Sequence, residues 1–68
     1  MVRIVSTRDS IRDQFVSAME HCDRIVERMR RADELAETRS EVLNAYLPLI
    51  LEGVDHLKKM LDRVRNEL

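Results

Sequence analysis

The chain has 68 residues, of which 44% are hydrophobic and 37% are charged, and its formal net charge is −1. A chain this short forms one domain (1–68), and its core alone supplies only about 3–5 kcal/mol of net stability. A single cysteine excludes an internal disulfide, and the balanced charge disfavours a role in holding a phosphate backbone. We therefore expect the chain to gain stability by associating with another chain.

The apolar runs of the chain are short. The longest, at 45–51, has seven residues, whereas a bilayer-spanning helix requires roughly 20. At the N-terminus, Arg8, Asp9 and Arg12 follow too soon for the apolar core of a signal peptide. We therefore expect no membrane contact and a cytoplasmic location, where a lone cysteine stays reduced.

Residues 1–6 are expected to form a tail or a short edge strand, because the alternation of apolar and charged residues at 2–5 is too brief for an independent strand. The first helix is predicted at 7–36, with Ser6 or Thr7 as its capping hydroxyl. Its apolar residues repeat every fourth and then every third position, as in a heptad seam. These residues are Ile11, Phe15, Ala18, Cys22, Ile25, Met29, Ala32 and Ala36.

A second helix is predicted at 39–67, with a kink near Pro48, because proline removes a helical hydrogen bond and clashes with the preceding turn. Its apolar residues follow the same 4-3 repeat, which predicts that they face the first helix. They are Leu43, Leu47, Ile50, Val54, Leu57, Leu61, Val64 and Leu68.

The position of the chain reversal is open between two places. The run Thr38-Arg39-Ser40-Glu41 has the residue types of a capping box, which predicts a turn at 36–40. A turn or sharp kink at Pro48 is the alternative. With the turn at 36–40 the two arms have similar lengths, and the predicted fold is an all-α, antiparallel two-helix hairpin.

The segment at 42–51 is apolar on every side, with Asn44 as its only polar side chain. A single antiparallel helix covers one face, so an isolated hairpin would leave Leu49, Leu51 and part of Val42 in water. We therefore predict that the hairpin dimerises into a four-helix bundle. The predicted interface consists of Val42, Tyr46, Leu47, Leu49, Ile50, Leu51 and Val54.

No set of residues predicts catalysis, a metal or a cofactor. His21 and Cys22 are neighbours, but adjacent helical residues point about 100° apart, so we expect Cys22 to be a small core residue. A metal site drawn from His21, Cys22, Glu52 and His56 lacks the Glu-x-x-His spacing of di-iron bundles. The cluster Arg28, Arg30 and Arg31 has acidic neighbours on the same helix, which is typical of a solvated face.

The run Thr38-Arg39-Ser40-Glu41-Val42-Leu43, with Ala45, Tyr46 and Leu47, resembles the start of the second helix of ribbon-helix-helix DNA-binding proteins. The resemblance covers roughly 15 residues. It implies a DNA-binding dimer in which residues 2–5 form the strand that pairs across the dimer and enters the major groove. The segment between that strand and Arg39 is about a dozen residues longer than in that fold, and Arg3 is the strand's only basic residue.

These observations favour a non-enzymatic protein–protein interaction module, such as a small helical adaptor, inhibitor or regulator, that acts as a homodimer. Nucleic acid is not an expected partner under this hypothesis, whereas a heterologous protein partner remains open. One alternative is the ribbon-helix-helix-like transcriptional regulator. Another is a small subunit of a larger helical complex.

Overall fold

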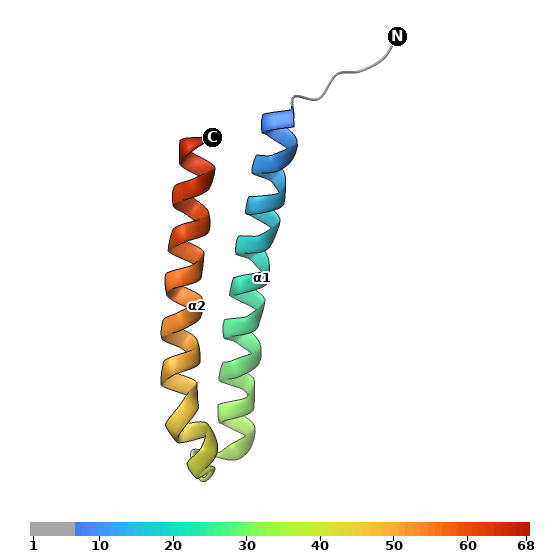
Figure 1. Ribbon diagram of the computed structural model, residues 1–68. Helices are drawn as coiled ribbons and strands as arrows, with labels where there is room; N and C mark the ends of the chain where they lie inside the picture. Colours follow the sequence, from blue (N-terminus) through green and yellow to red (C-terminus); the bar gives the residue numbers. More distant parts are fainter. Residues whose placement is uncertain (1–6) are drawn as a thin grey trace.

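The computed structural model describes residues 7–68, which form two long helices, α1 (Thr7–Ala36) and α2 (Glu41–Glu67). The helices run side by side in opposite directions and pack against each other (Figure 1). This arrangement confirms the predicted all-α hairpin. The predicted tail or edge strand at 1–6 lies outside the described residues. Neither helix is long and apolar enough to cross a membrane, as far as residues 7–68 are concerned.

The chain reverses between Ala36 and Glu41, the first of the two places considered. Glu37 and Thr38 have φ angles of 52° and 57°, in the left-handed region that glycine usually occupies after a helix. A residue with a Cβ adopts this conformation at a cost of about 1–2 kcal/mol. Neither position is the glycine that would mark such a turn in the sequence. Two hydrogen bonds hold the turn: the Glu37 amide donates to the Glu34 carbonyl (3.1 Å) and the Arg39 amide to the Ala36 carbonyl (3.0 Å).

The start of α2 corrects the sequence prediction by two residues, since the helix begins at Glu41 and not at residue 39. Its N-cap is Ser40, whose Oγ accepts a hydrogen bond from the Leu43 amide at 3.2 Å. The hydroxyl of Thr38, which the capping-box pattern would use as the cap, instead donates to the Glu37 carbonyl at 2.6 Å. Ser40 satisfies one of the otherwise free amides at the start of α2, so it fixes where the helix begins.

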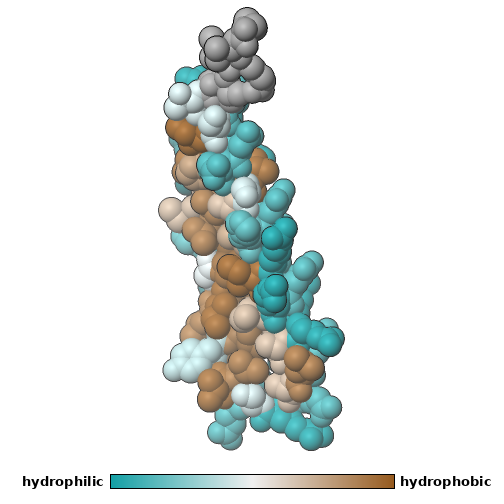
Figure 2. Space-filling model, turned by 90° about the vertical axis from the view of Figure 1, so that its right-hand side faces the viewer, coloured by the Kyte–Doolittle hydropathy of each residue, from teal (hydrophilic) through white to brown (hydrophobic). Residues whose placement is uncertain are grey.

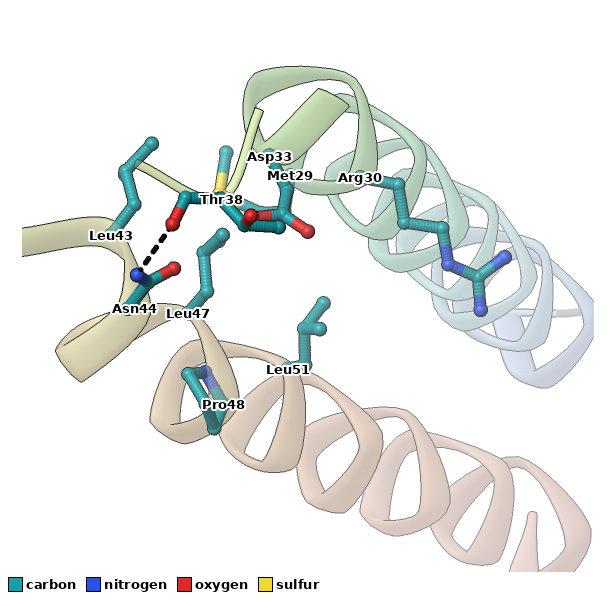
Figure 3. Close-up of a pocket in the computed structure, with 9 residues that line it drawn as sticks. All are labelled: Met29, Arg30, Asp33, Thr38, Leu43, Asn44, Leu47, Pro48 and Leu51. Atoms are coloured by element: carbon teal, nitrogen blue, oxygen red, sulfur yellow. Dashed lines mark hydrogen bonds between the residues drawn. The ribbon is translucent and has the colours of Figure 1, made fainter. Parts of the chain in front are cut away.

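Pro48 lies inside α2, and the helix is continuous on both sides of it. The proline ring provides no amide for a hydrogen bond to the Asn44 carbonyl, one turn earlier. The side chain of Asn44 makes a separate contact, because its Nδ2 donates to the carbonyl of Thr38 at 2.9 Å (Figure 3). This bond ties the first turn of α2 to the chain reversal. Pro48 therefore leaves the helix unbroken, and the predicted second turn site is not used.

The core of the hairpin is thin. Among the described residues, only Cys22 and Leu47 are buried, at 3% and 6% exposure. On α1 most of the predicted seam is half-buried or buried, including Phe15, Met29 and Ala36. Ile11 and Ile25 were also predicted for this seam but are 40% and 39% exposed, and the residue that follows each of them, Arg12 or Val26, is half-buried instead. Two helices can cover only one face of each other, so almost every apolar side chain of residues 7–68 retains contact with water.

The face that α2 turns toward α1 differs from the prediction at three positions. Ile50, Leu57 and Val64 were predicted to face α1, but they are 40%, 47% and 38% exposed. The residue that follows each of them is half-buried instead: Leu51, Lys58 and Arg65. The seam of α2 against α1 is therefore 47-51-54-58-61-65-68, which keeps the 4-3 repeat but is rotated around the helix.

Long cationic side chains make this rotation possible. The stems of Lys58 and Arg65 cover apolar surface while their charged ends remain in water, at side-chain exposures of 39% and 38%. Lys58 Nζ also donates to Asp23 Oδ1 of α1 at 2.6 Å, and Arg65 pairs with Asp62 at 2.8 Å. The pattern of apolar residues alone does not reveal such a seam, because two of its members are charged.

Candidate functional site

The two flanks of the groove between the helices differ in chemistry. On the first, which we call the charged flank, Lys58 of α2 pairs with Asp23 of α1 at 2.6 Å, the shortest ion pair of the described residues. The hydrogen bond to Asp23 raises the pKa of Lys58. Arg12 and Met19 of α1 lie on the same side, because they line surface hollows together with Arg65 and Lys58 respectively.

The second flank carries the residues that the rotation of α2 displaces from the core. On a helix, Ile50 and Leu57 lie about 100° away from Leu51 and Lys58, on the other side of the seam. On α1, the half-buried residue is Arg12, and the exposed Ile11 before it points toward the same side of the hairpin as Ile50 and Leu57. We call this second flank the open face. Its exposed large apolar residues are Ile11, Ile25 and Leu35 on α1 and Val42, Tyr46, Leu49, Ile50, Leu57, Met60 and Val64 on α2.

The open face is rich in large apolar residues, most of them on α2. Its ten large apolar residues are between 38% and 71% exposed. Apolar surface is also continuous along the molecule: Figure 2 shows one side of the hairpin, with a brown band along the long axis beside a teal one. Contiguous apolar surface of this kind marks sites of association.

Along α2 the open face itself has helical-seam spacing. Its central residues lie at 46, 50, 53, 57, 60 and 64, a 4-3-4-3-4 repeat. This is the pattern by which one helix packs along another. Helix α2 therefore carries two seams, and α1 covers only the first.

The exposed fractions of the ten open-face residues add up to about five whole side chains. Burying five such side chains is worth about 7–15 kcal/mol, which corresponds to about 300–600 Å² of apolar surface at 25 cal/mol per Å². A standard protein interface buries about 800 Å² per partner, of which about 60% is apolar. The open face therefore offers as much apolar surface as one side of a stable interface requires.

The residues predicted as the interface divide into two groups. Val42, Tyr46, Leu49 and Ile50 are exposed on the open face. The remaining three belong to the hairpin's own packing: Leu47 is buried, and Leu51 and Val54 are half-buried. The expectation that an isolated hairpin leaves Leu49 and Val42 in water is confirmed, at 63% and 66% exposure, whereas for Leu51 it was wrong.

The sequence reasoning missed six residues of the open face, most of which lie far from the turn. They are Ile11, Ile25, Leu57, Met60 and Val64 and, beside the turn, Leu35. The signal was present as the second 4-3 repeat of α2, which shares Ile50, Leu57 and Val64 with the predicted seam. Reading both repeats together would have required recognising Lys58 and Arg65 as seam residues.

A hollow of about 360 Å³ lies between the helices at the turn end. Its floor is apolar, from Met29, Leu47, Pro48 and Leu51, and Asp33 lies at its edge. Figure 3 shows Leu47 and Leu51 pointing from α2 toward α1, while the guanidinium of Arg30 points away from the other labelled side chains. The hollow has room for an apolar side chain, but Arg30 does not close over it.

The residues considered for chemistry are dispersed. Cys22 is buried in the core, as predicted, while its neighbour His21 is exposed. Within residues 7–68, no three histidine, cysteine or acidic side chains come together as metal ligands. Arg28, Arg30 and Arg31 are all exposed, and Arg31 lies 3.7 Å from Glu34, which agrees with a solvated face.

No protein-family model matches this chain, and neither a curated protein nor a solved structure has significant similarity to it.

Proposed function

We propose that this chain is a non-enzymatic protein–protein interaction module and that it acts as a homodimer in which two hairpins join through their open faces into a four-helix bundle. The observation that supports the proposal is the second apolar seam of α2, from Tyr46 to Val64, which α1 leaves exposed. A second copy supplies the missing two helices and places each seam in a bundle core.

Apolar surface favours association. The two open faces together expose about ten side chains' worth of apolar surface, and its removal from water drives association. The loss of rotational and translational freedom, the ordering of side chains and the desolvation of polar groups oppose it. Within residues 7–68, the hairpin alone has a core of only two buried residues. Dimerisation is therefore also the source of stability that a chain of this length needs.

The placement of reactive groups supports the non-enzymatic part of the proposal. Covalent catalysis by a Cys or Ser side chain requires a nucleophile, a base and an orienting group within hydrogen-bonding reach of one another. Cys22 is enclosed by the hairpin core, and His21 and His56 are exposed on different helices. An adaptor or regulator needs no such constellation, since a surface of defined shape is enough for its action.

Sedimentation equilibrium at micromolar concentrations tests the proposal, with a dimer mass as the expected result. Near-ultraviolet circular dichroism gives an independent measurement, because Tyr46 is the only tyrosine, tryptophan is absent and the hairpin leaves Tyr46 59% exposed. The Tyr46 signal should appear as the protein is concentrated and the ring becomes fixed in the bundle. A monomer mass at all concentrations, with a Tyr46 signal that does not change, would contradict the proposal.

A further inference from the structure

Gly53 has no role within the hairpin. It is the only glycine of the chain and lies near the middle of α2, where glycine disfavours a helix by about fivefold relative to alanine. Its backbone has no positive φ, and a Cβ added to it would meet nothing within 4 Å. Alanine would therefore fit there without strain. The absence of a side chain at Gly53 has no explanation in the contacts between α1 and α2.

The position of Gly53 on the open face suggests an explanation for its missing side chain. It belongs to the exposed seam of α2, between Ile50 and Leu57. A helix without a side chain at one position allows a second backbone to come closer at that point. Gly53 therefore forms a notch in the middle of the apolar stripe that is proposed as the interface.

The exposed apolar residues of α2 other than Ile50 are also arranged symmetrically about this notch. Val42 and Tyr46 lie 11 and 7 positions before Gly53, and Met60 and Val64 lie 7 and 11 positions after it. Turning the helix end over end about Gly53 therefore places large apolar side chains on large apolar side chains. Such self-complementarity is what a two-fold symmetric contact between identical helices requires.

We infer that, in the proposed dimer, α2 of one copy packs antiparallel against α2 of the second copy and that the two-fold axis passes close to Gly53. This inference rests on the proposed homodimer and adds its geometry. Tyr46 then lies beside Met60 of the partner subunit, and Val42 beside Val64 of the partner subunit. The two glycines meet at the centre, where the helices approach most closely.

This geometry differs from the other two-fold arrangement of two hairpins. With an axis along the bundle, each α2 lies next to α1 of the partner subunit, and the two α2 helices are diagonal neighbours. The two Gly53 positions then do not meet. In the geometry inferred here the turns lie at opposite ends of the bundle. The charged flank and the hollow at each turn then face outward, away from the dimer contact.

The Gly53→Ala variant distinguishes a Gly53 that contacts nothing from a Gly53 at the closest point between two helices, because it stabilises the protein in the first case and weakens the dimer in the second. If Gly53 has no contact, alanine strengthens the helix, raises the folding equilibrium constant about fivefold and leaves the dimer affinity unchanged. If Gly53 is the closest point between two helices, two inserted methyl groups push the backbones apart. The dimer dissociation constant then rises about tenfold or more, as is typical of overpacked contacts. Asn66→Ala, on the charged flank of α2, is the control, because it also favours the helix and should leave the affinity unchanged.

Cysteine cross-linking tests the orientation in a Cys22→Ala background. The Tyr46→Cys and Met60→Cys variants, mixed at a concentration where sedimentation shows dimers, should form a mixed disulfide on oxidation. Glu52→Cys, mixed with either variant, is the control and should remain uncross-linked. If the mixture is dimeric but forms no more cross-link than the control, and Gly53→Ala dimerises as tightly as the native chain, the antiparallel geometry is wrong while the proposed dimer stands. If the native chain is monomeric, both the antiparallel geometry and the proposed dimer are wrong.

Discussion

Replacing Met60 with lysine separates the energy of the open face from the energy of the hairpin. Methionine and lysine are unbranched side chains of similar length and similar helix propensity, so the helix itself should not change. Met60 is 53% exposed in the hairpin, and its exposed part becomes buried only on association. The variant therefore changes the polarity of the proposed interface and little else.

The expected loss follows from that exposed fraction. Burying a whole methionine side chain is worth about 1.5–3 kcal/mol, so the 53% that is still exposed is worth about 0.8–1.6 kcal/mol. A two-fold symmetric dimer contains the residue twice, which gives about 1.6–3.2 kcal/mol, or about a 15- to 200-fold rise in dissociation constant. The lysine stem can carry its ammonium to water at the rim, so no larger penalty for a buried charge is added.

Sedimentation equilibrium over a concentration series measures this change, and chemical denaturation of the dilute protein reports on the hairpin alone. Val16→Lys is the matched control, because it introduces the same charge in place of another exposed apolar side chain, 37% exposed, which lines a hollow with Arg12 and Arg65 on the charged flank. Met60→Lys should weaken the dimer and Val16→Lys should not. If Met60→Lys dimerises like the native chain, or if both variants weaken it equally, the open face is not the interface.

Three further predictions concern the turn and the charged flank. Ser40→Ala removes the acceptor for the Leu43 amide and should lower the free energy of unfolding by about 1 kcal/mol in urea denaturation, whereas Ser40→Asp should retain it. Glu37→Gly relieves a left-handed φ of 52° and should raise the unfolding free energy by up to about 1 kcal/mol; a decrease would show that the turn differs. Because pairing with Asp23 raises the pKa of Lys58, the stability from this pair should be complete at neutral pH and disappear only as the pH rises through that pKa, above 10.5. The difference in melting temperature between the native chain and Asp23→Asn measures it, and a difference already lost below pH 9 would contradict the assignment.

The two helices and the chain reversal between them could be predicted from local features of the sequence. The 4-3 spacing of apolar residues and the near absence of glycine and proline are properties of short segments, and they are enough to predict a helical hairpin. The exact start of α2 was less accessible. Both Thr38 and Ser40 are residue types that cap helices, and only the backbone shows that Thr38 has a φ of 57° and that Ser40 accepts from the Leu43 amide.

The location of the candidate site depends on which face of α2 packs against α1, and the spacing of apolar residues does not decide this. In α2 the predicted and the observed seams share Leu47, Val54, Leu61 and Leu68. They differ by one residue at three positions, where Ile50, Leu57 and Val64 were predicted and Leu51, Lys58 and Arg65 are observed. A rule that counts apolar residues favours the first seam. The structure adopts the second, because cationic side chains with apolar stems can line a half-buried groove and because Lys58 reaches Asp23 on α1.

Sequence by itself therefore determined the helices and the existence of surplus apolar surface, since these follow from residue types and their spacing. Only tertiary structure decided which side of α2 meets α1, and with it which apolar residues remain on the open face. The reason is physical: a rotation of about 100° exchanges two nearly equivalent faces of one helix. The balance between them is set by contacts with the other helix, which lie far away in the sequence.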